Sequence, residues 1–356
     1  MAFGAASGWT NLPNGNFSPV IYSKQVQLAF RKASIADAIT NNDYFGEIAN
    51  MGDTVKIIKE PEISVSAYLR GTTIAPQDLT DNDFSLVVDK ANYFAFKVDD
   101  IEEAHSHVNF QSLASDRAAY RLADQYDQEV LGYLSGYAQS ALHGNADAVN
   151  TTVNGTKANS SAGSDELLAA NKLDITNFGN ITTTSVAGDS IPVAARLPGA
   201  TALPTAYASP AMVVSRMARL LDAQNVPTTG RWIVIDPVMM EVLRDEDSRF
   251  LNADFGGSGL QNGLVLNNFH GFRVHVSNNL PSVGTGAGTT GTSAQQVNYG
   301  VIVAGHDSAV ATAEQINKTE TYRDPDSFAD IVRGMHLYGR KILRPEALVT
   351  ARYNLA

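Results

Sequence analysis

The chain has 356 residues, of which 44% are hydrophobic and 18% are charged, as expected of a globular protein with two or three folding units. Its formal net charge of −11 argues against an autonomous nucleic-acid-binding protein, because such proteins need clustered lysine and arginine. The sequence contains no cysteine, which excludes disulfides and thiolate chemistry, and no apolar run approaches the roughly 20 residues of a membrane span.

Residues 1–50 are interpreted as an N-terminal arm with one short helix. The first 20 residues are rich in Gly, Ala, Asn and Pro without a period, which predicts an extended segment that orders only against a neighbour. They lack the basic and apolar blocks of a signal peptide, so a soluble protein made in the cytoplasm is expected. Apolar spacing predicts a helix from Tyr22 to Ile39 that ends near Asn41.

Residues 51–100 are predicted to form one extended hairpin. Two runs with alternating apolar residues, Thr54 to Leu69 and Phe84 to Val98, flank the polar segment RGTTIAPQDLTDND. At about 3.3 Å per residue, strands of about fifteen residues reach nearly 50 Å, and a ribbon of that length is marginal by itself in water. We therefore expect either its own domain or a neighbouring subunit to cover it.

A long amphipathic helix, the spine helix, is predicted over residues 109–138, within a segment assigned to 101–143. The stretch has no proline and is rich in good helix formers. Its predicted buried stripe consists of Ala119, Leu122, Tyr126, Val130, Leu134 and Tyr137. The polar residues Asp116, Asp124, Asp127, Gln128 and Ser135 fall away from this stripe.

The second half of the chain divides into four predicted parts. Residues 144–209, rich in Asn, Ser, Thr and Gly, form either a loop or an inserted subdomain. Residues 210–224 form a helix on the side of the peripheral domain, with Ser209 as its N-cap. Residues 225–327 form a mixed α/β axial domain, with strands at Trp232 to Ile235, Phe272 to Val276 and Tyr299 to Ala304. Residues 328–356 are return strands of the peripheral domain.

No catalytic, cofactor-binding or metal-binding residue is predicted. Glu102, Glu103, His105 and His107 lie close together and could suggest a metal site, but no third ligand is placed by spacing beside the pair of histidines. Polar residues that cap the following helix explain the cluster better. The glycines from Gly286 to Gly291 match a dinucleotide fingerprint in letters but lack its strand and helix. The Ser258 neighbourhood is one residue short of a nucleophile elbow, because Leu260 stands where glycine is required. Asp324 and Asp326 flank a proline and indicate a turn.

The order of these parts resembles the major capsid proteins of tailed bacteriophages, which have the Hong Kong 97 type of fold. Three stretches carry the resemblance: Asp100 to Ala104 (DIEEA) before the spine helix, Asn268 to Val274 (NFHGFRV), and Tyr338 to Leu348 (YGRKILRPEAL) near the end. The resemblance implies an α+β fold with an N-terminal arm, an extended β-hairpin loop, a long spine helix, a peripheral domain and an axial α/β domain.

The resemblance further implies a structural protein without enzymatic activity or cofactors. Copies of it would self-assemble as hexamers and pentamers into the icosahedral shell of a virion, made in the bacterial cytoplasm, that encloses double-stranded DNA without sequence-specific binding. The implied partners are a scaffolding protein, a portal protein and a decoration protein, with no membrane. Because residues 70–83 hold no lysine, a covalent cross-link at the hairpin tip is not expected.

Two other interpretations remain open from the sequence. A cellular nanocompartment shell of the same fold would carry enzyme cargo in place of a genome. A metal-dependent enzyme would use Glu102, His105 and His107.

Overall fold

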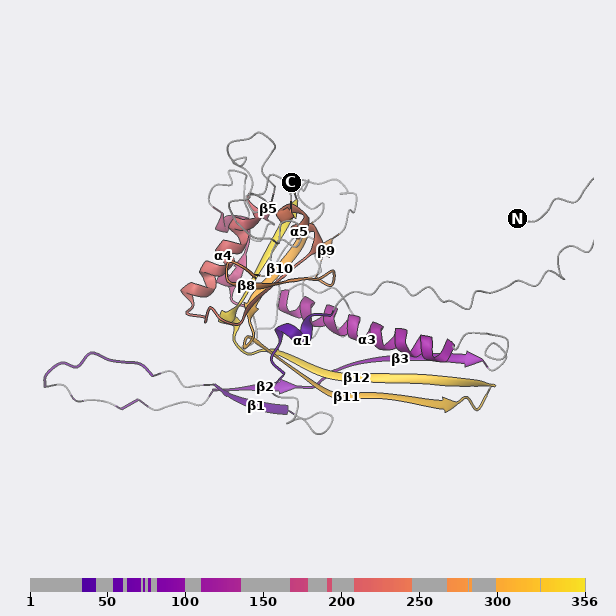
Figure 1. The fold of residues 1–356 in the computed structure, drawn as a ribbon. Coiled ribbons are helices and arrows are strands. Elements are labelled where there is room, and N and C mark those ends of the chain that lie inside the picture. Colours follow the sequence, from indigo (N-terminus) through magenta and orange to yellow (C-terminus); the bar gives the residue numbers. More distant parts are fainter. Residues whose placement is uncertain are drawn as a thin grey trace, which may run out of the picture.

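The structure is a computed structural model, and its main body consists of a long helix on one sheet joined to a second sheet domain (Figure 1). It describes residues 34–42, 54–59, 63–71, 73, 76–77, 82–99, 110–135, 167–178, 191–193, 208–244, 268–280, 282–283, 299–326 and 328–355.

The spine helix is α3 (Phe110–Ser135), close to its predicted extent. It lies along a three-stranded antiparallel sheet in the order β11 (Val310–Arg323), β12 (Ala329–Ile342) and β3 (Lys90–Asp99) (Figure 1). Opposite residues of an antiparallel pair share a face, so the ladders divide the sheet into an inner face towards α3 and an outer face. We call this the peripheral sheet.

The single long hairpin predicted over residues 51–100 is confirmed only in part, because its second strand ends at Val87 and does not continue to Val98. β1 (Thr54–Lys59) and β2 (Asn82–Val87) pair with each other over six residues, and residues 63–69 form no ladder. β3 instead pairs with β12 along its length. The ribbon separates from β3 at residues 88–89 because Leu86 and Val88 are buried against the peripheral sheet, where they meet Ala311, Ala313 and Leu337.

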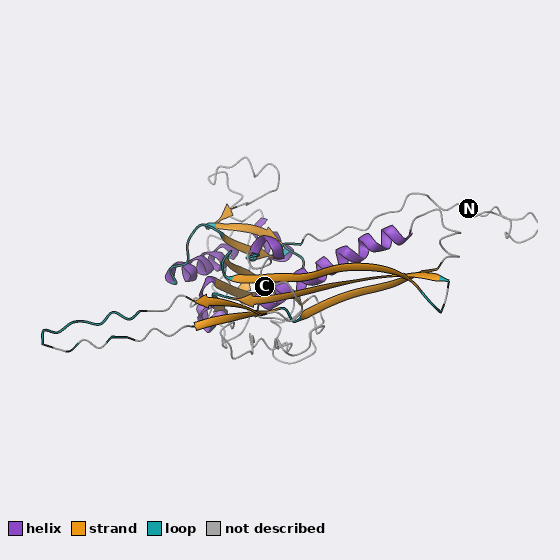
Figure 2. Cartoon of the chain, turned by 90° about the horizontal axis from the view of Figure 1, so that it is seen from below, coloured by secondary structure: helices purple, strands orange, loops and turns teal. Residues whose placement is uncertain are grey.

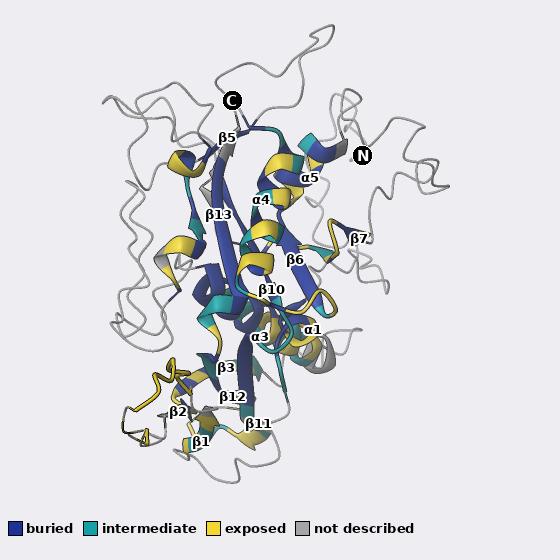
Figure 3. Cartoon of the chain, turned by 90° about the vertical axis from the view of Figure 1, so that its left-hand side faces the viewer, coloured by how far each residue is buried: buried dark blue, intermediate teal, exposed yellow. Residues whose placement is uncertain are grey.

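The larger sheet has eight strands and holds most of the core. Its main path is β4 (Lys172–Leu173), β13 (Leu348–Leu355), β10 (Tyr299–His306), β6 (Arg231–Ile235), β8 (Phe272–Val276) and β7 (Asn268–Phe269). β5 (Ile191–Val193) also pairs with β13, and β9 (Ser282–Val283) with β10. Short 3-10 helices lie at Ala169–Asn171, Ile175–Asn177 and Pro345–Ala347. Buried strands fill its centre (Figure 3).

Two helices of the larger-sheet domain begin where the sequence predicts. Ser209 caps α4 (Pro210–Ala223) by accepting a hydrogen bond from the Met212 N–H, and Gln224 follows its last turn. Asp236 accepts a hydrogen bond from the Met239 N–H at the start of α5 (Pro237–Arg244). Strands β6, β8 and β10 also fall on the predicted runs.

Several segments lie in a different sheet from the one predicted. β13 pairs with β10 in the larger sheet, not in the peripheral sheet, and α4 packs on β13 and α5. β11, within the range assigned to the axial domain, pairs with β12 in the peripheral sheet. The described parts of 144–209 are not a separate subdomain, because β4 and β5 add to β13 as parallel strands.

The predicted helix from Tyr22 to Ile39 is confirmed only at its end. The structure shows one turn, α1 (Ala36–Ile39), and Ile35 before it is not helical. Residues 22–33 lie outside the described part of the chain, as do residues 1–20. Figure 2 shows the loop at residues 63–71 and the far turn of the peripheral sheet at opposite ends of the molecule.

Candidate functional site

The loop carried by β1 and β2 exposes large apolar side chains. Val65 is 97% exposed, and Ile63, Tyr68 and Leu69 are each at least 65% exposed; Ile58 on β1 is similar (Figure 3). Covering a side chain of this size is worth about 1.5–3 kcal/mol, so several together form a contact surface that one copy of the chain leaves uncovered. We call residues 63–71 the projecting loop.

The projecting loop stands on an anchored base. Leu86 and Val88 are buried against the peripheral sheet, which fixes the ribbon at its root. The Ser64 hydroxyl donates a hydrogen bond of 2.9 Å to Gln77 Oε1, which joins the projecting loop to a residue that follows it in the chain. The loop is therefore presented away from the body by a fixed ribbon.

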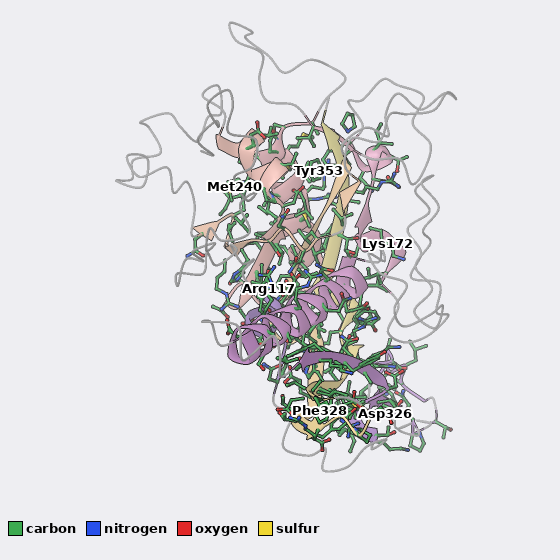
Figure 4. All side chains as sticks on the ribbon, turned by 90° about the vertical axis from the view of Figure 1, so that its right-hand side faces the viewer. Arg117, Lys172, Met240, Asp326, Phe328 and Tyr353 are labelled. Carbon is green, nitrogen blue, oxygen red and sulfur yellow. The ribbon has the colours of Figure 1, made fainter. Side chains whose placement is uncertain are left out.

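The outer face of the peripheral sheet is a second exposed surface with aromatic residues. Tyr93 on β3 is 81% exposed and lies opposite Met335 on β12. Arg333 lies over the Tyr322 ring at 5.0 Å and pairs with Glu320 at 2.8 Å. Phe328 is 78% exposed in the turn between β11 and β12, which also contains Asp326 (Figure 4). Aromatic and arginine side chains together are typical of protein–protein contacts.

The carboxylate of Asp127, in the middle of α3, anchors the end of the arm. Asp127 Oδ1 accepts hydrogen bonds from the Ile35 and Ala36 N–H groups at 2.7 and 2.8 Å, and from the Ser34 hydroxyl at 3.2 Å. Asp127 Oδ2 accepts one from Asn279 Nδ2 at 2.7 Å. Since these bonds satisfy the first N–H groups near α1, they explain why a new helical turn begins at Ala36.

Asp124, Asp127 and Ser135 fall away from the predicted apolar stripe, yet all three are buried. The second half of α3 lies between the peripheral sheet and the larger sheet, so both its apolar and its polar sides are covered. Val130 and Leu134 are buried as predicted, whereas Ala119 in the first half of the helix is exposed. The amphipathic pattern therefore predicts only part of the buried surface.

A buried ion pair joins the same half of α3 to β12. Arg340 Nη1 lies 3.2 Å from Glu129 Oε2 and donates a hydrogen bond of 2.7 Å to the Glu129 carbonyl. Its guanidinium lies 4.8 Å from the centre of the Tyr133 ring. Removing one partner of a buried pair typically costs about 3–5 kcal/mol, so this contact fixes the spine helix on the peripheral sheet.

The residues considered for chemistry mostly lie outside the described part of the chain. These are Glu102, Glu103, His105, His107, Ser258 and the glycines from Gly286 to Gly291. Within the described residues, no group of three His, Asp or Glu side chains is arranged to hold a metal ion. Asp324 and Asp326 form the expected turn, in which Asp324 Oδ1 accepts a hydrogen bond from the Asp326 N–H. No helix in the described ranges is long and apolar enough to cross a membrane.

The described parts define the Hong Kong 97 type of fold, the shell-protein fold that the resemblance implied. They are the short helix at the end of the arm, a ribbon with a projecting loop, a long helix on a peripheral sheet, and a second sheet domain.

Comparison with solved structures supports this fold over nearly the whole chain. A chain from Mycobacterium phage Che8 is 22% identical with a TM-score of 0.65, covering 95% of this chain and 97% of that one. The capsid structure of cyanophage P-SCSP1u gives 20% identity and a TM-score of 0.61, covering 96% and 93%. The capsid of Ralstonia phage GP4 gives 13% identity and a TM-score of 0.60, covering 99% and 98%. No protein-family model and no curated protein matches the sequence.

Proposed function

We propose that this chain is the major capsid protein of a tailed phage. Copies of it assemble as hexamers and pentamers into the icosahedral shell of the virion, which encloses double-stranded DNA. The protein acts structurally, without catalysis or a cofactor. The observation that carries the proposal is the projecting loop, whose apolar side chains, led by Val65, have no cover in a single copy.

The geometry supports contacts between different surfaces of neighbouring copies. The projecting loop and the far turn of the peripheral sheet lie at opposite ends of the molecule (Figure 2). A contact that joins different surfaces of two copies generates a ring when the rotation closes. We therefore propose that the loop of one copy lies on the next copy around a ring.

Three further partners follow from this function. A separate scaffolding protein directs assembly, a portal protein occupies one vertex, and a decoration protein binds the outside of the shell. The exposed aromatic residues on the outer face of the peripheral sheet, such as Tyr93 and Tyr322, provide a surface for contacts of this kind.

Electron microscopy of the purified chain, alone and with the scaffolding protein of the same phage, tests the proposal. Rings or closed shells are expected. A chain that stays monomeric under every assembly condition would overturn it. Analysis of the contents of native particles separates a genome-carrying shell from a nanocompartment, because the second would hold an enzyme and no packaged DNA.

A further inference from the structure

β3 forms one edge of the peripheral sheet, and only one of its two sides is paired. β12 pairs with that side along the length of β3. On the other side, the backbone groups of Tyr93 to Lys97 form no hydrogen bond with any described residue. An unpaired edge of this kind is a template on which a further strand can add.

The two edges of the peripheral sheet differ in how they are protected. The other edge strand, β11, contains Glu314, Glu320 and Arg323, and a bulge shifts its register after Glu314. Charged residues and bulges are the usual devices that keep an edge strand from pairing. β3 has neither a charged residue nor a bulge from Ala91 to Phe96. β3 is therefore the edge of this sheet that is suited to pair with another strand.

The projecting loop contains the matching feature, a segment with a strand-like sequence that pairs with no strand. Residues 63–68 read ISVSAY, so apolar side chains alternate with serine or tyrosine, and all six residues are exposed. They form no ladder with any described strand. The loop extends away from the peripheral sheet of its own copy (Figure 1), so it can reach β3 only on another copy.

One hydrogen bond shows which side of the loop segment is available for pairing. The Ser64 N–H donates a hydrogen bond of 3.1 Å to Gln77 Oε1. In an extended segment, the N–H groups of alternate residues point to the same side. The N–H groups of Val65 and Ala67 therefore point away from Gln77, whereas the N–H of Ser66 points to the same side as that of Ser64. A partner strand is expected to pair through Val65 and Ala67.

We propose that residues 63–68 of one copy add to the β3 edge of a neighbouring copy and become the fourth strand of its peripheral sheet. The inference rests on the proposed assembly and names the surface that receives the projecting loop. Backbone hydrogen bonds supply the attraction, and the alternation of side chains fixes which face of the added strand lies inward.

The apolar side chains of the added strand lie on the inner face of the sheet. There Val65 and Ala67 continue the surface formed by Phe94 and Phe96, whose rings are half-buried and stacked with their centres 6.1 Å apart. The side chain of Ser66 lies on the outer face, where Tyr93 is 81% exposed. The strand thus presents apolar residues to the core side and polar residues to solvent, as a half-buried strand does.

Two neighbouring proline substitutions test strand addition in the full-length chain. Ala67→Pro removes an N–H on the pairing side, whereas Ser66→Pro removes one on the side that faces away from β3, where an edge strand tolerates proline. We expect Ala67→Pro to lower the yield of rings or shells at least about tenfold and Ser66→Pro to change it less than about twofold. Electron microscopy and sedimentation measure the yield, and circular dichroism checks folding. Equal yields for the two variants would overturn the proposal.

Cysteine pairs locate the contact directly, because the chain has no cysteine of its own. Ser66→Cys is combined with Ala91→Cys, Tyr93→Cys or Ala95→Cys, one at a time, on the outer face of β3. Directly opposite residues of paired strands have Cβ atoms about 4.5–5.5 Å apart, so one of these pairs is expected to form a disulfide between copies on mild oxidation of assembled particles. A non-reducing gel shows the linked chains.

The control pair joins the same loop position to the opposite edge of the sheet. Ser66→Cys with Tyr322→Cys, which is on the outer face of β11, is expected to remain unlinked. Assembled particles that form no link to β3, or that link equally well to β11, would overturn the inference and leave the proposed function standing. A chain that forms no particle under any assembly condition would overturn both.

Discussion

The side-chain amide of Asn279 donates a hydrogen bond of 2.7 Å to Asp127 Oδ2, and this bond joins the larger-sheet domain to the middle of the spine helix. The other oxygen of the same carboxylate accepts the Ile35 and Ala36 N–H groups. One buried carboxylate therefore connects the arm, the spine helix and the larger-sheet domain.

Asp127→Ala is expected to lower the free energy of unfolding by about 2–4 kcal/mol. The substitution leaves the Ile35 N–H and the Asn279 amide buried without their acceptor. Urea unfolding followed by circular dichroism measures the loss. A change below about 0.5 kcal/mol, the size typical of a surface substitution, would contradict the role of this carboxylate.

A reciprocal exchange separates the hydrogen bond from general packing. Asp127→Asn places two amide donors against each other, and Asn279→Asp places two carboxylates together, so each single variant is expected to be destabilised. In the combined variant the amide introduced at position 127 can donate to the carboxylate introduced at position 279. The double variant is therefore expected to lose less stability than the sum of the single variants, which a double-mutant cycle measures.

Two glycines of β12 are expected to differ in how they tolerate alanine. A Cβ on Gly334 would lie 2.3 Å from the Phe94 ring, and a Cβ on Gly339 would lie 2.4 Å from the Val87 carbonyl oxygen. The half-buried Phe94 ring can move, whereas the backbone at Val87 is held in place. We expect Gly334→Ala to cost about 1–2 kcal/mol and Gly339→Ala to cost more.

Combining Gly334→Ala with Phe94→Leu provides the control. The smaller side chain removes the ring atoms that the new methyl group would meet, so the pair is expected to cost less than the two single changes added together. Thermal unfolding of the four proteins gives this comparison. If the costs of the two single changes simply add, the contact between residues 94 and 334 does not limit the size of the side chain at position 334.

The stability contribution of Asp236 is expected to depend on pH. Burial raises the pKa of this carboxyl, although hydrogen bonds from Tyr353 and the Met239 N–H partly oppose the shift. The folded chain therefore binds this proton more tightly than the unfolded chain. The stabilisation that comes from binding this proton is complete below the ordinary pKa of the carboxyl, about 3.9. It is lost as the pH rises through the raised pKa of the folded chain.

The Asp236→Asn variant cannot titrate at this position. Its free energy of unfolding, relative to the wild type, is expected to increase from about pH 4 upward and then to level off. Urea unfolding at a series of pH values measures the difference. Tyr353→Phe, which keeps the carboxyl and removes a hydrogen bond to it, is expected to retain the pH dependence. A constant difference between Asp236→Asn and the wild type would disprove the expectation.

Val65→Asp in the projecting loop is expected to block assembly without lowering the free energy of unfolding. The side chain is 97% exposed, so the charge costs nothing in the free chain but would be buried in the proposed contact. Ser66→Asp adds the same charge at an exposed polar neighbour and is expected to assemble better. Electron microscopy and sedimentation, with urea unfolding of both variants, make the comparison.

Deletion of residues 61–83 extends the same argument. The described residues in this range make few contacts with the body, so the shortened chain is expected to fold and to fail in assembly. A strong loss of helical circular dichroism would show that the segment contributes to folding of the monomer.

Local signals predicted many elements correctly. The spine helix, the cap at Ser209 and the buried strand from Trp232 to Ile235 each depend on neighbouring residues, through propensity, capping or a continuous apolar run. β11 was not predicted, because Glu314, Lys318 and Glu320 interrupt its apolar pattern and its pairing with β12 determines its conformation.

The candidate site was only partly predictable. Apolar residues of the projecting loop could be recognised from alternation, but their exposure depends on how far the ribbon extends, which in turn depends on Leu86 and Val88 at its base. The hydrogen bonds of Asp127 could not be predicted from the helical pattern. Its partners Ile35 and Asn279 lie 92 residues earlier and 152 residues later in the chain. Contacts of this range arise only from the tertiary fold.

The position of β13 has a consequence for synthesis of the protein. The strand Leu348–Leu355 lies between β4 and β10, inside the larger sheet, and every other described strand precedes it in the chain. The sheet therefore cannot close while the ribosome is still producing residues 1–347, and a prematurely terminated polypeptide lacks an interior strand. Such fragments would expose sheet edges, which makes them targets for chaperones and proteases.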